Sequence, residues 1–109
     1  MKQYELCWAS LPRRAGRRPV LLPSRGAAYE YLNKVLAVEI TSTVRSIAVE
    51  VPLGTEGLSQ RCVANCDNNR TVSRSALVKR IGQLATRRVP ELKRAVGHAL
   101  AWDELIGAD

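Results

Sequence analysis

The sequence predicts a small, mainly β protein that ends in one α-helix. Short apolar or alternating stretches recur along the first 84 residues, separated by polar segments that contain Pro or Gly, which is typical of antiparallel strands. From Pro90 onward, apolar residues instead recur at helical spacing. Strand after strand joined by polar turns favours a strongly bent antiparallel sheet or barrel.

The strands are expected over residues 3–9, 18–24, 35–41, 46–51, 61–66 and 78–84. In the first of these, Tyr4, Leu6 and Trp8 alternate with more polar residues, which predicts a strand with one buried face. Pro23 suggests that the second strand ends at a sheet edge or a bulge.

Loops and a single helix fill the rest of the expected fold. Residues 10–17 and the polar run Asp67 to Arg70 are expected to be loops. Pro90 suits the first position of a helix, where its missing N–H costs nothing, and this helix is expected to run to Gly107. With no repeat or linker in view, residues 1–109 are expected to form a single domain.

The charge pattern favours a polyanionic partner. Among 109 residues, 17 are Lys or Arg and 10 are Asp or Glu, a net charge of +7. Nucleic acid fits this charge first and an anionic membrane surface second. No acidic residue occurs between Glu5 and Glu30, where five arginines stand, and a second basic stretch runs from Arg70 to Arg94, interrupted only by Glu91.

The start of the chain does not resemble a signal peptide, and no apolar run is long enough to span a bilayer. We therefore expect a cytoplasmic protein without a membrane partner. Its three cysteines are then expected to be reduced thiols.

No metal or cofactor site is expected. Cys62 and Cys66 have no second Cys/His pair to complete a zinc site, and on a strand their even spacing favours packing on one buried face. His98, the only histidine, is expected on the surface. Acidic residues are not clustered as a two-metal nuclease site requires.

The remaining candidate site is an arginine-rich loop that meets polar strand ends. Arg17 and Arg18 enter the second strand, Thr41 to Thr43 end the third, and Asp67 to Arg70 follow the fifth. In a small meander the ends of alternate strands can converge on one rim. A solvated rim without function would have the same pattern.

At these residues the sequence resembles the MazF/PemK/Kid toxin family. Segments similar to the family's motifs follow in the family's order over nearly the whole chain. They are Tyr4-Glu-Leu-Cys-Trp8, Gly16-Arg-Arg-Pro-Val20, Glu39-Ile-Thr-Ser42, Val63-Ala-Asn-Cys-Asp-Asn-Asn-Arg-Thr-Val72, Ile81-Gly-Gln-Leu84 and the Pro90-Glu91 helix start.

The resemblance implies an SH3-like barrel of the CcdB/PemK type and a toxin of a type II toxin-antitoxin system. Such a toxin is a homodimer that inhibits translation by sequence-selective, metal-independent cleavage of single-stranded RNA. The products are 2′,3′-cyclic phosphate and 5′-hydroxyl ends. A cognate, MazE-like antitoxin is implied as a partner.

The family's site residues carry over to Arg18 and Thr41, with Asp67 as a candidate base. Arg18 is expected to stabilise charge on the phosphate and Thr41 to hold an oxygen by hydrogen bonding. The residues expected to bind RNA are Arg13, Arg14, Arg17, Arg25, Ser42, Asn68 and Arg70. Trp8 and Tyr29 are candidates for stacking on bases, although alternation favours a core position for Trp8.

Three positions depart from the family pattern. Asn65 stands where Kid-type members have an arginine, Asn68 replaces the common Gln, and Val89 replaces a capping Ser or Thr. Two other hypotheses remain open at this point: a basic SH3-like module that only binds nucleic acid or protein, and a gyrase-directed toxin of the CcdB kind. Fold alone does not choose between them.

Overall fold

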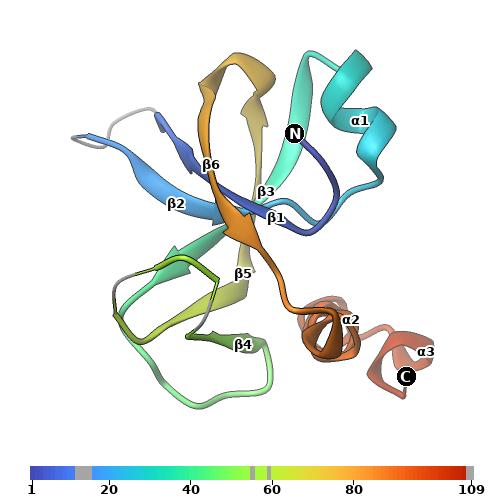
Figure 1. The fold of residues 1–109 in the computed structure, drawn as a ribbon. Coiled ribbons are helices and arrows are strands. Elements are labelled where there is room, and N and C mark those ends of the chain that lie inside the picture. Colours follow the sequence, from blue (N-terminus) through green and yellow to red (C-terminus); the bar gives the residue numbers. More distant parts are fainter. Residues whose placement is uncertain (12–15, 55, 59, 108–109) are drawn as a thin grey trace.

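The computed structural model describes residues 1–11, 16–54, 56–58 and 60–107. Its centre is a six-stranded antiparallel sheet in the order β4-β5-β3-β2-β1-β6 (Figure 1). The strands are β1 (Glu5–Ala9), β2 (Arg18–Leu21), β3 (Lys34–Thr41), β4 (Glu50–Leu53), β5 (Cys62–Ser73) and β6 (Leu77–Gln83). The helices are α1 (Gly26–Tyr31), α2 (Val89–Leu100) and α3 (Asp103–Ile106), with 3-10 turns η1 (Arg74–Ala76) and η2 (Thr86–Arg88). The expected class, mainly β with a C-terminal helix, is confirmed.

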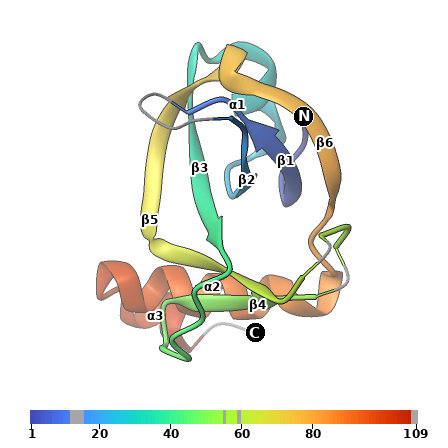
Figure 2. The ribbon, with the colours of Figure 1, turned by 90° about the vertical axis from the view of Figure 1, so that its left-hand side faces the viewer.

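The curled sheet carries an apolar cluster on each of its two faces. One cluster includes Leu6, Leu21 and Val38 and extends to Leu92 of α2. The other includes Cys7 and Val20 and extends to the residues around α1. Figures 1 and 2 show α1 and α2 at opposite ends of the strands.

The expectation of a half-buried first strand is wrong. Leu6, Cys7 and Ala9 are all completely buried, because β1 lies between β2 and β6 and contributes side chains to both clusters. Only Trp8 of its central residues is partly exposed. Alternation therefore identified the strand but not the number of its covered faces.

The polar run Asp67 to Arg70 is not a loop but the middle of β5. This half of the strand pairs with β3, with Asn69 opposite Val38 and Arg70 opposite Ala37. β4 pairs only as far as Asn65, so beyond that point β5 has a neighbour on one side and its residues remain polar. Figure 2 shows the sharp bend of β5 between its two halves.

The fourth strand begins at Glu50 rather than at Ser46. The Glu50 carboxylate accepts hydrogen bonds from the backbone N–H of Arg45 and of Ser46, where Ser46 has a φ of 57°. These bonds hold residues 45–50 in a compact turn. Side-chain competition for backbone donors thus replaces the expected ladder.

Helix α1 was not expected. Tyr29 anchors it: its hydroxyl donates to the carbonyl oxygen of Leu36 at 2.9 Å and accepts from the N–H of Ser24 at 3.1 Å. Tyr29 is 4% exposed and belongs to the core, so its suggested role in stacking on bases is wrong. His98 is exposed, as expected.

The C-terminal helix is shorter than expected. Ala101 adopts the left-handed conformation and ends α2, and α3 folds back against it. A Cβ at Gly97 would lie 2.7 Å from the N atom of Ile106, so glycine permits this close packing. Among the described residues, no helix is both long and apolar enough to cross a bilayer.

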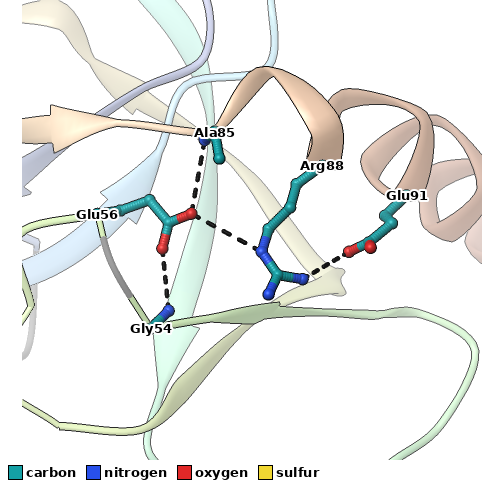
Figure 3. A network of polar contacts seen from close by, with 5 residues as sticks. All are labelled: Gly54, Glu56, Ala85, Arg88 and Glu91. Atoms are coloured by element: carbon teal, nitrogen blue, oxygen red, sulfur yellow. Dashed lines mark hydrogen bonds and ion pairs between the residues drawn. The ribbon is translucent and has the colours of Figure 1, made fainter.

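A buried ionic network joins the loop after β4 to the start of α2 (Figure 3). One oxygen of Glu56 accepts from the N–H of Gly54 at 2.9 Å. The other oxygen accepts from the N–H of Ala85 at 3.5 Å and lies 3.8 Å from Nε of Arg88. Nη1 of Arg88 donates to the carboxylate of Glu91 at 2.8 Å. The Glu56 side chain is 1% exposed. β4 and β6 are the two edges of the sheet, so this network closes the barrel where no ladder does.

Two glycines let the same loop lie directly on β6. A Cβ at Gly82 would overlap the carbonyl oxygen of Glu56. Gly57 has a φ of 99°, and a Cβ there would lie 2.8 Å from the carbonyl oxygen of Ile81. The backbones of loop and strand are therefore in contact, with no room for a side chain between them.

We predict that Gly82→Ala destabilises the protein by about 2 kcal/mol, because the added methyl group must push the Glu56 backbone away. The midpoint of urea denaturation measures the loss. Gly54→Ala is the matched control in the same loop, since a Cβ there meets nothing within 4 Å. Equal stability of the two variants would contradict the proposed closure.

Candidate functional site

A cleft of about 450 Å³ opens where β2 begins and β3 ends. Its walls combine cationic and polar side chains with a few apolar ones. The lining residues are Trp8, Arg17, Arg18, Pro19, Glu39, Ile40, Thr41, Ser42, Thr43, Arg45, Leu58, Gln60, Cys62, Asn65 and Asn68.

The sheet register brings Arg18 and Thr41 together. β2 and β3 are antiparallel, with Leu21 opposite Val38 and Val20 opposite Glu39. The last pair of this ladder, Val20 and Glu39, lies two residues from Arg18 on β2 and two residues from Thr41 on β3. Residues two apart on a strand share a face of the sheet. Arg18 and Thr41 both line the cleft.

Local hydrogen bonds prepare the Thr41 hydroxyl for a ligand. Its Oγ1 accepts from the N–H of Thr43 at 3.1 Å, an arrangement that turns the chain out of β3. A hydroxyl that accepts in this way keeps its own proton for donation. Ser42, the next residue, is exposed at the same rim.

Trp8 and two further arginines extend the cationic wall. The Arg17 guanidinium lies 5.9 Å from the centroid of the Trp8 ring, within the range of a cation–π contact. Trp8 is partly exposed in the cleft rather than buried in the core. Arg45, which the sequence did not single out, also lines the cleft, because the turn held by Glu50 carries it there.

A bulge in β5 brings asparagines to the cleft. Ile40 pairs with Ala64 and Val38 with Asn69, so Glu39 alone faces four residues of β5. Within this bulge Asn65 is 7% exposed, and its Oδ1 accepts from the N–H of Asp67 at 2.9 Å. Asn65 and Asn68 line the cleft, whereas Asp67 is exposed and does not.

Glu39 is the one carboxylate among the described residues of the cleft wall. Nη1 of Arg70 donates to it at 3.2 Å, from the neighbouring strand β5. Arg70 therefore contacts an acid of the cleft and does not itself line it. The sequence reasoning missed Glu39 as a residue of the site. Its position two residues before Thr41 on the same strand was the signal that could have found it, because such residues share a face.

Arg25, another arginine expected to bind RNA, does not line this cleft. Arg25 immediately precedes α1, beyond the opposite end of β2 from Arg18. Arg13 and Arg14 lie outside the described residues. Of the expected RNA-binding residues, the structure therefore gathers Arg17, Ser42 and Asn68 around Arg18 and Thr41.

All three thiols are buried, which was expected for Cys62 and Cys66 but not for Cys7. Burial raises the pKa of Cys7 to about 11 and that of Cys66 to about 12, with further contributions from Glu5 and Asp67 respectively. Cys62 borders the cleft but is 5% exposed, and burial, with the Glu56 charge, raises its pKa as well. Among the described residues, no group of three or more His, Cys, Asp or Glu is arranged to hold a metal ion.

Residues 2–100 match the model of a protein family described as the PemK-like, MazF-like toxin of type II toxin-antitoxin systems. The chain belongs to this family. A PemK/MazF-like toxin with a similar sequence is endoribonuclease MazF3 of Mycobacterium tuberculosis, 38% identical over 90 residues that cover 82% of this chain and 87% of the relative. Probable endoribonuclease MazF5 of the same organism is 39% identical over 83 residues, covering 74% and 75%.

Solved structures of PemK/MazF-like toxins share the fold. Toxin MazF-mt6 of Mycobacterium tuberculosis superposes with a TM-score of 0.82 at 36% identity and covers 89% of this chain and 96% of its own. An endoribonuclease in complex with its cognate antitoxin, from a mycobacterial species, gives a TM-score of 0.82 at 25% identity and covers 94% and 96%. The expected PemK-type barrel is thus confirmed.

We predict that the native protein reacts slowly with the thiol reagent DTNB at pH 8, because its cysteines are buried and held as thiols. The absorbance of the released thionitrobenzoate measures the rate. The same protein in guanidinium chloride is the control and is expected to react completely. Rapid stoichiometric labelling of the folded protein would reveal an activated cysteine and contradict this account.

Proposed function

We propose that this toxin is a metal-independent endoribonuclease that cleaves single-stranded RNA and so inhibits translation. The observation that carries the proposal is the presence of Arg18 and Thr41 in the wall of one cationic cleft. The mycobacterial relatives are named endoribonuclease MazF3 and probable endoribonuclease MazF5, which supports the same activity.

RNA brings its own nucleophile, so the protein's task is to orient and to neutralise. The 2′-hydroxyl must lie in line with the 5′-leaving oxygen while negative charge grows on the non-bridging oxygens. The Arg18 guanidinium stabilises that charge through its paired donors. Thr41 donates its hydroxyl proton to a phosphate oxygen and holds the group in place. The products are a 2′,3′-cyclic phosphate and a 5′-hydroxyl.

The rest of the cleft binds the strand around the scissile bond. Arg17 and Arg45 face phosphates, and the exposed part of Trp8 offers a surface on which a base can stack. Ser42 and Asn68 supply hydrogen bonds to sugar or base edges. Asp67 does not line the cleft and is not one of the residues proposed to contact the RNA.

The proposal includes the partners that the family membership suggests. The toxin acts in the cytoplasm as a homodimer, and a cognate antitoxin binds over the RNA cleft to silence it. One similar solved structure, an endoribonuclease with its cognate antitoxin, supports such a pairing.

We predict that Arg18→Ala loses at least about 100-fold in RNA cleavage, because a preorganised donor is removed from the developing charge. A long single-stranded RNA is incubated with the purified protein, and its fragments and their 5′-hydroxyl ends are analysed on a gel. Activity is expected to persist in EDTA. Arg87→Ala, at an exposed arginine outside the cleft, is the matched control.

Loss of cleavage in EDTA would contradict the metal-independent mechanism, and wild-type activity of Arg18→Ala would remove Arg18 from the site. Intact RNA in every lane would overturn the activity itself and favour the binding module or the gyrase-directed toxin. Thermal melting of each variant separates a lost group from a lost fold.

We also predict that Arg17→Ala lowers affinity for a non-cleavable 2′-O-methyl RNA and reduces the salt dependence of binding. Loss of one phosphate contact lowers the slope of log K against log salt by about 0.7 for a single strand. Fluorescence anisotropy at several salt concentrations measures this slope. Lys93→Ala on the outer face of α2 is the control and keeps the slope; an unchanged slope in Arg17→Ala would contradict the phosphate contact.

A further inference from the structure

Positive charge alone does not explain why the cleft wall contains the carboxylate of Glu39. A negative group repels a phosphodiester, so it weakens binding unless it acts on another part of the RNA. Glu39 nevertheless lines the cleft among Arg17, Arg18 and Arg45. Its side chain is 17% exposed, so it is held at the cleft surface rather than extended into solvent.

Glu39 lies close in the sheet to Arg18 and Thr41, the two residues proposed to contact the phosphate. It pairs with Val20 and lies two residues before Thr41 on β3. Residues two apart on a strand share a face and lie about 6.6 Å apart along it. Glu39 and Thr41 therefore share a face of β3, and both line the cleft together with Arg18.

Arg70 orients this carboxylate from the adjacent strand. Its Nη1 donates to one oxygen of Glu39 at 3.2 Å, and the Arg70 side chain is 34% exposed. Arg70 stands opposite Ala37 on β5, at the far side of the bulge that faces Glu39. This contact restricts the rotamers of Glu39, as a catalytic carboxylate requires.

We propose that Glu39 is the general base of the cleavage reaction and that Arg70 is its positioning residue, an inference that rests on the proposed ribonuclease function. Glu39 takes the proton of the 2′-hydroxyl as the bond from O2′ to phosphorus forms. The bond from phosphorus to O5′ breaks, and the leaving oxygen takes a proton from water. Glu39 then returns its proton to solvent, so no reagent other than RNA is consumed.

Charged groups lie around Glu39 on several elements. Arg70 approaches from β5, Arg17 and Arg18 from the start of β2, and Arg45 from the turn after β3. Asp67 is an acid of β5, exposed outside the cleft wall. A general base acts in its deprotonated form, so the activity is expected to fall on the acid side of the pH profile.

The decisive variant is Glu39→Gln, which keeps the size of the side chain and an acceptor for Arg70. We expect kcat for a single-stranded RNA to fall about 100-fold, the contribution of a general base, with little change in KM. The acid-side fall of kcat with pH is expected to disappear in this variant. Glu30→Gln, the same change at an exposed position on α1, is the control and keeps wild-type kinetics.

A second pair of variants tests Arg70. Arg70→Gln is expected to lower kcat less than Glu39→Gln does, while the acid-side fall of kcat persists. Arg70→Lys restores part of the rate because it keeps a cationic donor. If Arg70 acts only through Glu39, Arg70→Gln adds no further loss once Glu39 has been replaced, so the double variant is expected to match Glu39→Gln alone.

Four results would overturn the inference. Glu39→Gln with wild-type kcat and pH profile would exclude a base at this position. An unchanged rate with a different set of cut sites would make Glu39 a base-recognition residue instead. Loss of the acid-side fall in Asp67→Asn, and not in Glu39→Gln, would assign the proton to Asp67. A wild-type protein that cleaves no RNA would refute the ribonuclease function, and this inference with it.

Discussion

The contacts of the buried Glu56 carboxylate are the interaction on which the rest of the structure depends. β4 and β6 are the free edges of a curled sheet, and Glu56 joins the loop beyond one to the helix start beyond the other (Figure 3). A charge this deeply buried is tolerable only when it is fully paired. Hydrogen bonds from the N–H groups of Gly54 and Ala85 and the ion pair with Arg88 provide the partners of this carboxylate.

The cleft is built from irregularities that this closed framework holds in place. Beyond the bulge in β5, the compact turn before β4 carries Arg45 to the rim. The loop held by Glu56 contributes Leu58 and Gln60 to the wall. Regular strands supply Arg18, Glu39 and Thr41 on one face. Rigid register thus orients the groups proposed to do chemistry, while bends and loops enclose them.

The sequence predicted most of the strands because alternation and turn residues are local signals. It failed where distant partners decide the structure. Residues 67–70 look like a loop because they are polar, yet β3 pairs with them. Ala101 carries no signal for a left-handed helix end, and the close approach of α3 to Gly97 of α2 is a feature of the folded chain.

The site followed the same division. Arg18 and Thr41 were found through the resemblance to known toxins, and Arg17 and Ser42 through their position beside them. Glu39 and Arg45 were missed. α1 separates β2 from β3 in the chain, so no loop length reveals which residues of the two strands face each other. That register is a property of the folded sheet.

The loop held by Glu56 also has a consequence for the order in which parts of the site are made during synthesis. Among the described residues, those that line the cleft all precede position 69, whereas Ala85 and Arg88, which hold Glu56, follow it. A nascent chain therefore carries these cleft residues before the partners of Glu56 have been added. The loop beside the cleft gains its anchor only when the segment that leads into α2 has been made.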